Sequence, residues 1–537
     1  MINTFDFLIL WGLFILGSFF FLNYFAGESK VKTFAVFLLF LAILSVVYSS
    51  GITGHYIFHD DVYLWKWDKT NWATHPSYAQ QAIFGRPLAA LVMFSADSFV
   101  DSVKSANFVR FLTIVIISLI ALGIDIWLRQ VCGILRKASF LVSFAIVILP
   151  PFQMFVNDLS ACYITVATLL SIFSALLLLG LDRNQKQHLN FMLFWEITKE
   201  PWFTVFLSLF FLSCSLMIYQ SGATFFIALL AIWLIGVNCR EMNNIKWPWF
   251  HLVVFFFATL IYLFLFKMLV PVDMRGIASA YSNSVTSDYA AKLWWFFRDP
   301  FFAALNLWHV FPTWTVAGGV LFIILLGFML EFFSLMKSEG GNKRILALNF
   351  LLKYFAVLFL IFLSFSVNLV AQTNLFLYRT IAPLIAIVFV LFWSGIRRIM
   401  AAFLKGGRYE TYAIIVLFFI CVCGGSFAYT TFRKYCVDNN SRELRYIEDE
   451  LTRKYNSNTR EVYIIRPLAR LSSQVPIADE FGVTTCFFPQ DIPWLVKAAF
   501  QERRISLFGG VLLTSGISMP PSSQDPHLLA IDLNRSK

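Results

Sequence analysis

The feature that most constrains this chain is the recurrence of apolar stretches about 20 residues long, from the first residues to about residue 430. The hydrocarbon core of a bilayer is about 30 Å thick, and a helix of roughly 20 apolar residues crosses it. Only 14% of the residues are charged, which does not suit the surface of a soluble domain of this length. The sequence therefore predicts an all-α polytopic membrane protein.

Twelve membrane spans are predicted from these stretches. The least certain division lies in "SLMIYQSGATFF", where a tight turn is placed near Gln220 and Ser221. Merging the segments on either side of that turn would invert everything downstream. The predicted spans are 5–25, 33–50, 109–129, 139–157, 160–181, 202–219, 222–238, 248–271, 314–335, 347–370, 378–396 and 411–430.

The basic residues follow the membrane topology. With twelve spans, six loops that carry Lys and Arg fall on one side, and the positive-inside bias makes that side cytoplasmic. These loops are "ESKVK", "RQVCGILRK", "DRNQKQ", "NCREMNNIK", "KSEGGNKR" and "RRIMAAFLKGGR". Topology thus explains the net charge of +11 better than a nucleic-acid partner does. The other side receives both termini, loops 51–108 and 272–313, and the tail.

The sequence predicts two domains and one helix that lies on the membrane surface. Residues 1–430 form the predicted membrane domain, and 431–537 form a small soluble α/β domain with strands from "EVYIIR" and "HLLAIDL" and a helix from "DIPWLVKAAFQERR". Aromatic residues in loop 272–313 predict a helix lying in the headgroup layer. Cys436 and Cys486, the two cysteines of the polar tail, are expected to form a disulfide if the tail faces an oxidising compartment.

The stretch "FHDDVYLWKWDKT", residues 58–70, places two adjacent acids about ten residues beyond the second span. Adjacent side chains diverge, so one of Asp60 and Asp61 can face a reaction centre while the other holds a loop. The alternative is that they are solvated loop acids or a helix N-cap, which is the more common role of an isolated acid pair. The ring of Trp65 suits a sugar, although interfacial belts also enrich Trp. With His59 the acids could hold a divalent metal, but the spacing matches no firm ligand rule.

Further candidate residues lie at the outer ends of the predicted spans. Arg86 in "FGRPL" offers a planar fork for phosphate, or is a snorkelling or ion-paired loop residue. Arg379 in "LFLYRTIAP" falls about a turn inside the eleventh span, where its partner is a lipid phosphate or an acid on a neighbouring helix. Tyr219, Gln220 and Asp158 share this face, and they either cap helix ends or contact a substrate.

These motifs resemble a known family. The combination of "HDDVYLW", "GRPLAALVM", "MIYQSGATFF" and "YRTIAP" is similar to the membrane glucosyltransferases that modify bacterial O-antigen, the Gtr-type serotype-converting family. The resemblance implies a GT-C-like fold in the bacterial inner membrane, with the active site and the α/β domain facing the periplasm. It implies transfer of a hexose, with glucose expected, from an undecaprenyl-phosphate donor to a lipid-linked O-antigen or related lipopolysaccharide glycan.

The resemblance also assigns roles to the candidate residues. Asp60 or Asp61 is the expected general base, and Arg86 and Arg379 are expected to bind the departing phosphate. Contacts to substrate are expected from Gln220, Tyr219, Asp158 and Trp65, with no cofactor required. The alternatives are a transporter or flippase of lipid-linked sugars, and an O-antigen polymerase or ligase.

Overall fold

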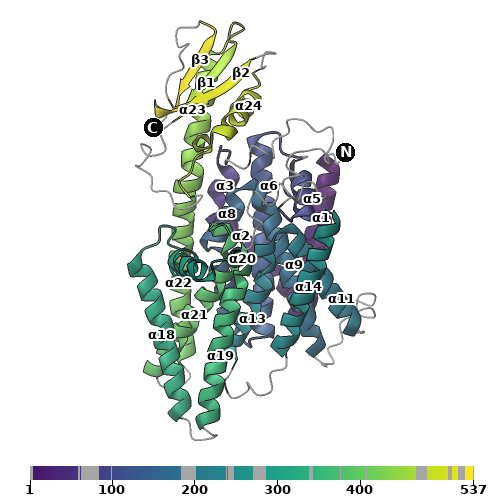
Figure 1. Ribbon diagram of the computed structural model, residues 1–537, viewed down its shortest axis with the longest axis vertical. Helices are drawn as coiled ribbons and strands as arrows, with labels where there is room; N and C mark the ends of the chain where they lie inside the picture. The colour runs from purple at the N-terminus through teal and green to yellow at the C-terminus, as the bar shows by residue number, and fades with distance from the viewer. Residues whose placement is uncertain are drawn as a thin grey trace.

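The protein is largely helical, with a small three-stranded sheet near its C-terminus (Figure 1). The computed structural model describes residues 4–58, 61, 81, 84–97, 99–182, 201–237, 239, 247–269, 286–337, 343–374, 376–404, 408–466, 481–505, 511–517 and 526–535. Among the site candidates, Asp60 and Trp65 lie outside these residues, as do His59 and the middle of the loop 51–108.

Helices occupy the stretches that the sequence predicted as spans. Within the described ranges, nine helices are long and apolar enough to cross a membrane, and the bent pair α7–α8 would make a tenth. The segments α9 and α12–α13 are shorter apolar helices by the same measure, so the count of twelve stays a prediction. The helices of the bundle are α1 (Thr4–Ala26), α2 (Lys30–Val47), α3 (Ser49–Thr53), α5 (Pro87–Asp97), α6 (Val103–Gln130), α7 (Arg136–Val147), α8 (Pro150–Asn157), α9 (Cys162–Asp182), α11 (Pro201–Ile218), α12 (Gln220–Ala223), α13 (Phe225–Gly236), α14 (Trp247–Leu269), α18 (Trp314–Lys337), α19 (Lys343–Ser364), α20 (Ser366–Val370), α21 (Ala382–Phe403) and α22 (Arg408–Phe432).

Burial separates a central helix from an outer ring. The apolar window of α6 is 94% buried, whereas those of α14 and α18 are only 17% and 22% buried. Large apolar side chains such as Phe256, Phe264 and Phe322 are exposed on these outer helices. Exposed Phe side chains at this density do not suit water, so the outer ring is the surface that faces lipid.

Small residues allow one pair of helices to approach closely. On α18, a Cβ built on Gly327 would lie 2.5 Å from the Cα of Gly395 on α21. A Cβ on Gly395 would lie 2.6 Å from the carbonyl oxygen of Ile323. Without side chains at this crossing the two backbones pack directly, as is common between membrane helices.

The chain reverses direction at the turn predicted near Gln220. Ser174 on α9 hydrogen-bonds to Ser208 on α11, and Ser215 farther along α11 donates to the carbonyl of Ala167, so α9 and α11 are antiparallel. The far end of α13 lies beside Cys132, which follows α6. Tyr219 is extended, with φ −161° and ψ 113°, and separates α11 from α12. The two apolar segments are therefore distinct helices.

The bundle has two different ends. At the end where α1, α6, α18 and α21 finish, called here the basic end, Arg129 bonds to Glu28 at 2.8 Å and Arg397 to Glu410 at 2.6 Å. At the opposite end, called the Asp61 end, α6 and α21 begin and the C-terminal domain lies (Figure 1). The described basic residues of the loops that the sequence assigned to one side thus gather at one end of the fold.

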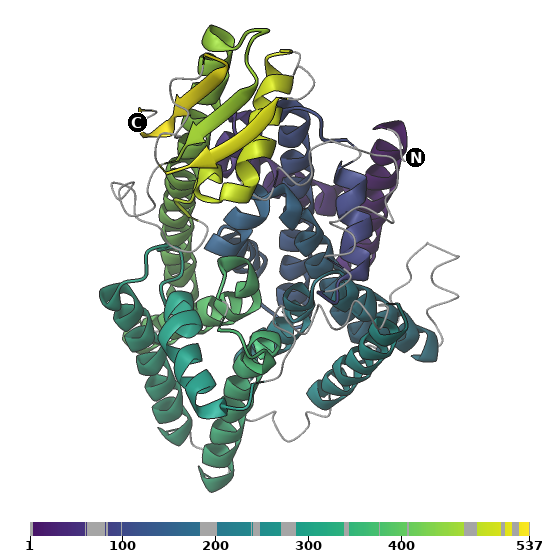
Figure 2. The same ribbon diagram turned by 45° about the horizontal axis from the view of Figure 1, so that its top comes forward.

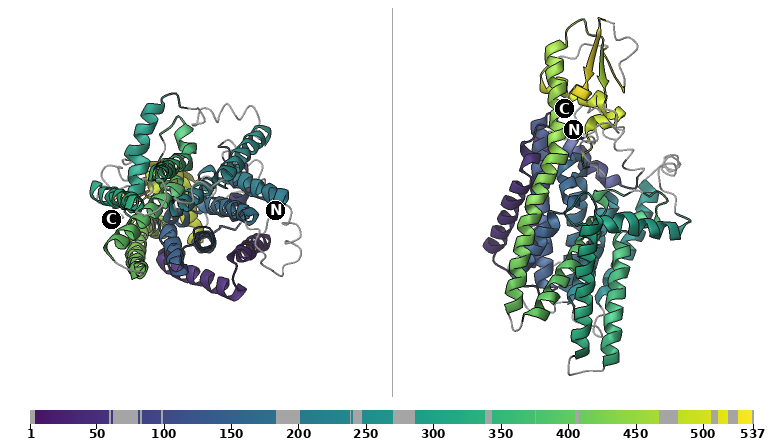
Figure 3. Two further views of the ribbon diagram at one scale, coloured as in Figure 1. Left: turned by 90° about the horizontal axis from the view of Figure 1, so that it is seen from below. Right: turned by 90° about the vertical axis from the view of Figure 1, so that its left-hand side faces the viewer.

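The C-terminal domain grows out of the last long helix. From Arg408 to Lys454 the chain is one helix of 47 residues, made of α22, the π-helical turn η7 (Arg433–Val437) and α23 (Asp438–Lys454) (Figure 3). It crosses the boundary that the change of composition predicts near residue 430. Beyond it lies a parallel sheet in the order β2-β1-β3, packed with α24 (Ile492–Glu502) above the bundle (Figure 2). The strands are β1 (Glu461–Ile465), β2 (Leu512–Gly516) and β3 (Leu528–Asp532).

The predicted strands in "EVYIIR" and "HLLAIDL" and the predicted helix in "DIPWLVKAAFQERR" are confirmed as β1, β3 and α24. Strand β2 was not predicted from the sequence, because its side chains lack a strict apolar alternation. The predicted disulfide is wrong for this structure, because Cys436 and Cys486 are both buried and no disulfide joins them.

The predicted interfacial segment forms α16 (Tyr289–Phe296), the π-helical turn η5 (Phe297–Phe301) and α17 (Phe302–Leu305). The segment runs across the ends of α18 and α19 rather than along them (Figure 3). Phe296 is buried and packs against Phe362 of α19, whereas Trp294 is 68% exposed. This one-sided exposure is what a helix lying in a headgroup layer requires.

Candidate functional site

The candidate site lies at the Asp61 end, where the chain leaves α3 and returns at Asp61. The Asp61 side chain is completely buried. Its Oδ2 accepts hydrogen bonds from the backbone N–H of Phe58, at 2.8 Å, and from Nη2 of Arg110 on α6. Its Oδ1 accepts from the backbone N–H of Leu159 at 2.7 Å. One carboxylate therefore ties the loop to α6 and to the turn η3 (Leu159–Ala161).

Arg110 is held from every side. Its side chain is also fully buried, it stacks on the ring of Tyr56 at 3.9 Å, and its Nη1 donates to Asn107 at 2.9 Å. A buried charge of this kind persists only when it is paired and hydrogen-bonded. Complete burial raises the pKa of Asp61 to about 7, although Arg110 and the two backbone donors lower it. Arg110 was missed in the sequence, where an arginine at the start of the third span was the available signal.

A second ion pair lies close to the first. Asp158, at the C-cap of α8, is fully buried and binds Nη1 of Arg379 at 2.8 Å. Arg379 lies in the 3₁₀ turn η6 (Tyr378–Thr380), which precedes α21, so it stands just outside the helix in which the sequence had placed it. Of the two partners expected for Arg379, the structure contains the acid. The Arg379 side chain is 17% exposed, so part of it is accessible.

The motifs "FGRPL" and "MIYQSG" meet at the third part of the site. Gly85, with φ +78°, makes a turn that a residue with a side chain adopts only under strain. Its carbonyl accepts from Nε2 of Gln220 at 2.9 Å and from the hydroxyl of Tyr262 at 3.2 Å. Oε1 of Gln220 accepts from Nε of Arg86 at 3.3 Å, and Arg86 stacks on the ring of Tyr219 at 4.4 Å.

The two terminal nitrogens of Arg86 make no hydrogen bond to a described residue. Within the described parts of the chain, the Arg86 side chain hydrogen-bonds through Nε alone. Such a fork, fixed by a stacked ring and an amide, is suited to bind two oxygens of one phosphate. Gln220 lies on α12, and its side chain hydrogen-bonds to Tyr262 of α14 and to Gly85 and Arg86 of the loop. In this structure Gln220 therefore positions Arg86.

Tyr163 joins the two arginine clusters. It lies on the first turn of α9, beside η3, and its ring contacts Tyr219 edge-on at 5.7 Å between centroids. Arg86 and Arg379 are both within electrostatic range of its hydroxyl. The predicted residues Arg86, Tyr219, Gln220, Asp158, Arg379 and Asp61 are thus gathered at one end of the bundle. Tyr163 and Tyr262 were not predicted as site residues from the sequence.

The C-terminal domain forms one wall beside this site. The Thr485 hydroxyl donates to the carbonyl of Ile57 at 2.9 Å, and Glu502 accepts from the backbone N–H of Val103 at 2.6 Å. The loop that carries Asp61 is therefore fixed between the membrane helices and the soluble domain. His55 on the same loop bonds to Glu448 of α23 at 2.7 Å.

A metal site is not apparent in the described part of the chain, where no three side chains of His, Cys, Asp or Glu come together. His59 and Asp60, which the metal alternative requires, lie outside that part.

No protein-family model matches the chain, and no curated protein matches it significantly.

Proposed function

We propose that the protein is an inverting membrane glycosyltransferase, which moves a hexose from a polyprenyl-phosphate donor to a lipid-linked O-antigen or related surface glycan. The observation that carries this proposal is that Arg86 and Arg379 both lie within electrostatic range of Tyr163, at the end of an apolar helical bundle where Asp61 anchors its loop. A lipid carrier delivers its phosphate and sugar to just this level, where its chain remains among lipid-facing helices.

The two adjacent acids, Asp60 and Asp61, are assigned different roles. The oxygens of Asp61 already accept three hydrogen bonds and the side chain is fully buried. Asp61 is therefore assigned as a positioning residue that anchors the loop. Asp60, its covalent neighbour, is assigned as the general base that takes the proton of the acceptor hydroxyl, a contribution of about 10² to 10⁴ in rate.

The leaving group needs cations. As the acceptor oxygen bonds to the anomeric carbon, the bond from that carbon to the phosphate oxygen breaks and the carrier leaves as polyprenyl phosphate. The added negative charge is stabilised by the terminal nitrogens of Arg86 and by the exposed part of Arg379, with each preorganised contact worth about 3 to 4 kcal/mol in comparable cases. A single displacement of this kind inverts the anomeric configuration.

Tyr219, Gln220 and Asp158 support these cations. Tyr219 and Gln220 fix the orientation of the Arg86 guanidinium, and Asp158 forms an ion pair with Arg379. Trp65 is assigned to stack on a sugar ring. No cofactor is required by this scheme.

The proposed location is the inner membrane of a bacterium, with the Asp61 end in the periplasm. Support comes from the gathering of basic residues at the opposite end, which the positive-inside rule makes cytoplasmic. Sugar donors at the periplasmic face must be carried by lipids, because nucleotide sugars are confined to the cytoplasm.

The test compares Asp60→Asn with Asp61→Asn in purified protein given a polyprenyl-phosphate hexose and a lipid-linked glycan. Asp60→Asn is expected to lower the transfer rate by about 10² to 10⁴ without changing the melting temperature. Transfer at the wild-type rate by this variant would refute the assigned base. In cells, loss of glycan modification while lipid-linked sugar still reaches the outer leaflet separates an enzyme from a flippase.

A further inference from the structure

A groove with a volume of about 620 Å³ opens on the lipid-facing side of the bundle, between α2, α7 and α22. It is called here the α7 groove. Two basic residues of the first turn of α7, Arg136 and Lys137, belong to its lining. The rest of the lining is almost entirely apolar and includes Val36, Leu39, Phe140, Ile415, Phe418 and Phe419.

The basic residues lie at the mouth of the groove that is nearer the basic end. All three helices begin at that end, and two contacts fix their relative heights. The ring of Phe40 on α2 stacks on Phe140 of α7 with centroids 4.4 Å apart, and the carbonyl of Leu141 accepts from Sγ of Cys421 on α22 at 3.2 Å. Arg136 lies about 6 Å nearer the basic end than Phe140. Its side chain leans farther that way, because helical side chains point toward the N-terminus.

The acids at this mouth are already paired with arginines. Asp125 of α6, which also lines the groove, bonds to Arg129 at 2.9 Å. Glu28, in the loop before α2, bonds to Arg129 at 2.8 Å and to Arg136 at 3.2 Å. Each of these two carboxylates is therefore occupied by a guanidinium group.

Two lysines add positive charge that no described acid neutralises. Lys137 of the groove and Lys32 of α2 are both exposed, and neither has an ion pair within the described parts of the chain. Lys32 precedes Val36 by four residues and Leu39 by seven, so it lies on the face of α2 that lines the groove. No side chain caps the N-terminus of α7, whose first N–H groups also point toward the basic end. The mouth of the groove is therefore suited to a phosphate group.

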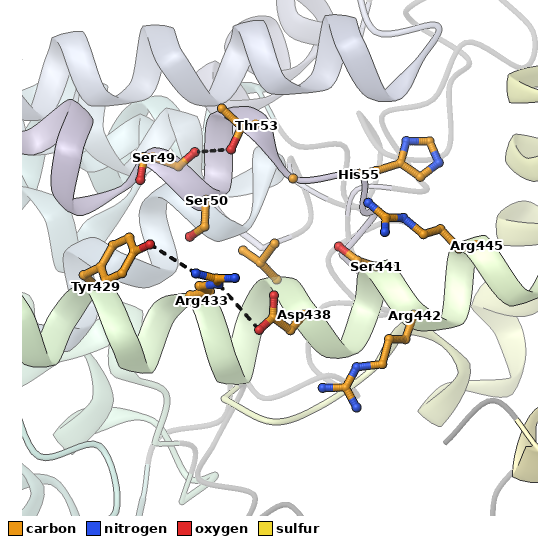
Figure 4. Close-up of a pocket in the computed structure, with 12 residues that line it drawn as sticks. Ser49, Ser50, Thr53, His55, Tyr429, Arg433, Asp438, Ser441, Arg442 and Arg445 are labelled. Carbon is orange, nitrogen blue, oxygen red and sulfur yellow. Dashed lines mark hydrogen bonds and ion pairs between the residues drawn. The ribbon is translucent and has the colours of Figure 1, made fainter.

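A second cavity, of about 530 Å³, lacks this combination. It lies at the Asp61 end between α3 and the long α22–η7–α23 helix, and hydroxyl and guanidinium groups dominate its lining (Figure 4). Such a lining does not suit an acyl chain. Arg433 and Arg442 are nine residues apart along the helix, about 13 Å, so one phosphate does not contact both. In the α7 groove, by contrast, the basic groups are adjacent and the apolar walls begin beside them.

We propose that the α7 groove binds an anionic phospholipid. Its phosphate lies between Lys32, Lys137 and the first N–H groups of α7, and one acyl chain runs inward between Phe140 and Phe418. Basic pockets between membrane helices bind anionic headgroups in this way. A zwitterionic lipid offers the same chain, but its headgroup brings a positive charge to a basic site. The bound lipid joins α2 and α22 to α7, and the site does not depend on the glycosyl transfer proposed above.

The experiment uses the full-length protein, purified in detergent and titrated with phosphatidylglycerol or with phosphatidylcholine. Native mass spectrometry counts the bound lipids and gives a Kd for each. The wild type is expected to bind phosphatidylglycerol more tightly than phosphatidylcholine. The double variant Lys32→Gln with Lys137→Gln is expected to bind phosphatidylglycerol about 25-fold more weakly, roughly fivefold for each lysine, with little change for phosphatidylcholine.

The matched control removes two other lysines from the same end of the bundle. Lys337, the last residue of α18, and Lys343, the first of α19, are both exposed and lie outside the groove. The double variant Lys337→Gln with Lys343→Gln is expected to bind phosphatidylglycerol as the wild type does. Because neither lysine of the groove pairs with a described acid, the groove variant breaks no ion pair of the described fold.

Three results would overturn the proposal. One is equal affinity of the wild type for the two lipids, which decides the matter even if a variant fails to fold. Another is equal affinity for phosphatidylglycerol in the groove variant and the control variant. The third is a rise in melting temperature with inorganic phosphate alone that matches the rise with phosphatidylglycerol, because this would make the site one for a soluble anion.

Discussion

Breaking the buried ion pair between Asp61 and Arg110 is expected to be among the most damaging single changes at the site. Both side chains are fully buried, and the carboxylate also holds two backbone N–H groups. In Asp61→Asn the charge is lost and one oxygen becomes an NH₂ group, which then faces a donor instead of accepting from it. Removing one partner of a buried pair costs about 3 to 5 kcal/mol, because the other charge is left unpaired.

A double-mutant cycle separates the interaction energy between Asp61 and Arg110 from the effects of the two single substitutions. Asp61→Asn and Arg110→Gln are each expected to lower the free energy of unfolding by about 3 to 5 kcal/mol, and the double variant by clearly less than the sum, because no unpaired charge remains in it. The assay is equilibrium unfolding of the purified protein in mixed micelles with a rising fraction of dodecyl sulfate. The control is Asp299→Asn, which breaks the solvent-exposed pair with Arg298 and is expected to leave stability close to the wild type.

If the free energy of unfolding of Asp61→Asn is within about 1 kcal/mol of the wild-type value, the carboxylate does not anchor the loop as its contacts indicate. If the two single variants add to give the double variant, Asp61 and Arg110 are not energetically coupled. Either result would also remove the basis for assigning the base to Asp60 rather than Asp61.

Two further predictions concern other charged residues. Arg379→Gln is expected to weaken use of a polyprenyl-phosphate donor at least about tenfold; Asp158→Asn disrupts the same ion pair but keeps the guanidinium, and an equal loss of donor use in both variants would contradict a contact between Arg379 and phosphate. Burial raises the pKa of Glu443 to about 7 from its usual value of 4.5. The folded protein therefore binds this proton more tightly than the unfolded chain, and the stability contributed by the neutral carboxyl is present below about pH 4.5 and is lost as the pH rises through about 7, by up to about 3 kcal/mol. Glu443→Gln is expected to remove this part of the dependence, measured as the difference in melting temperature between about pH 5 and about pH 8; an unchanged difference would contradict the raised pKa.

The apolar segments of the fold could be predicted from sequence because span length is a local property. Each stretch of about 20 apolar residues must form a helix in a bilayer, whatever its neighbours are. The turn near Gln220 was predicted in the same way and is present, although the full count of spans stays a prediction. The strand β2 was missed because its pairing with β1, rather than its own pattern, makes it a strand.

For the site, the sequence by itself determined which residue types were unusual: a pair of acids, and arginines at the ends of apolar segments. Only the tertiary structure decided their partners, because an ion pair such as Asp61 with Arg110 joins residues 49 positions apart and Arg379 with Asp158 joins residues 221 apart. The composition of the sequence determines which residues must avoid lipid. The packing of the helices determines which opposite charge each charged side chain contacts. That is why a sequence can indicate that a charge needs a partner, while only the fold shows that Asp61 is held by Arg110 and by two backbone N–H groups.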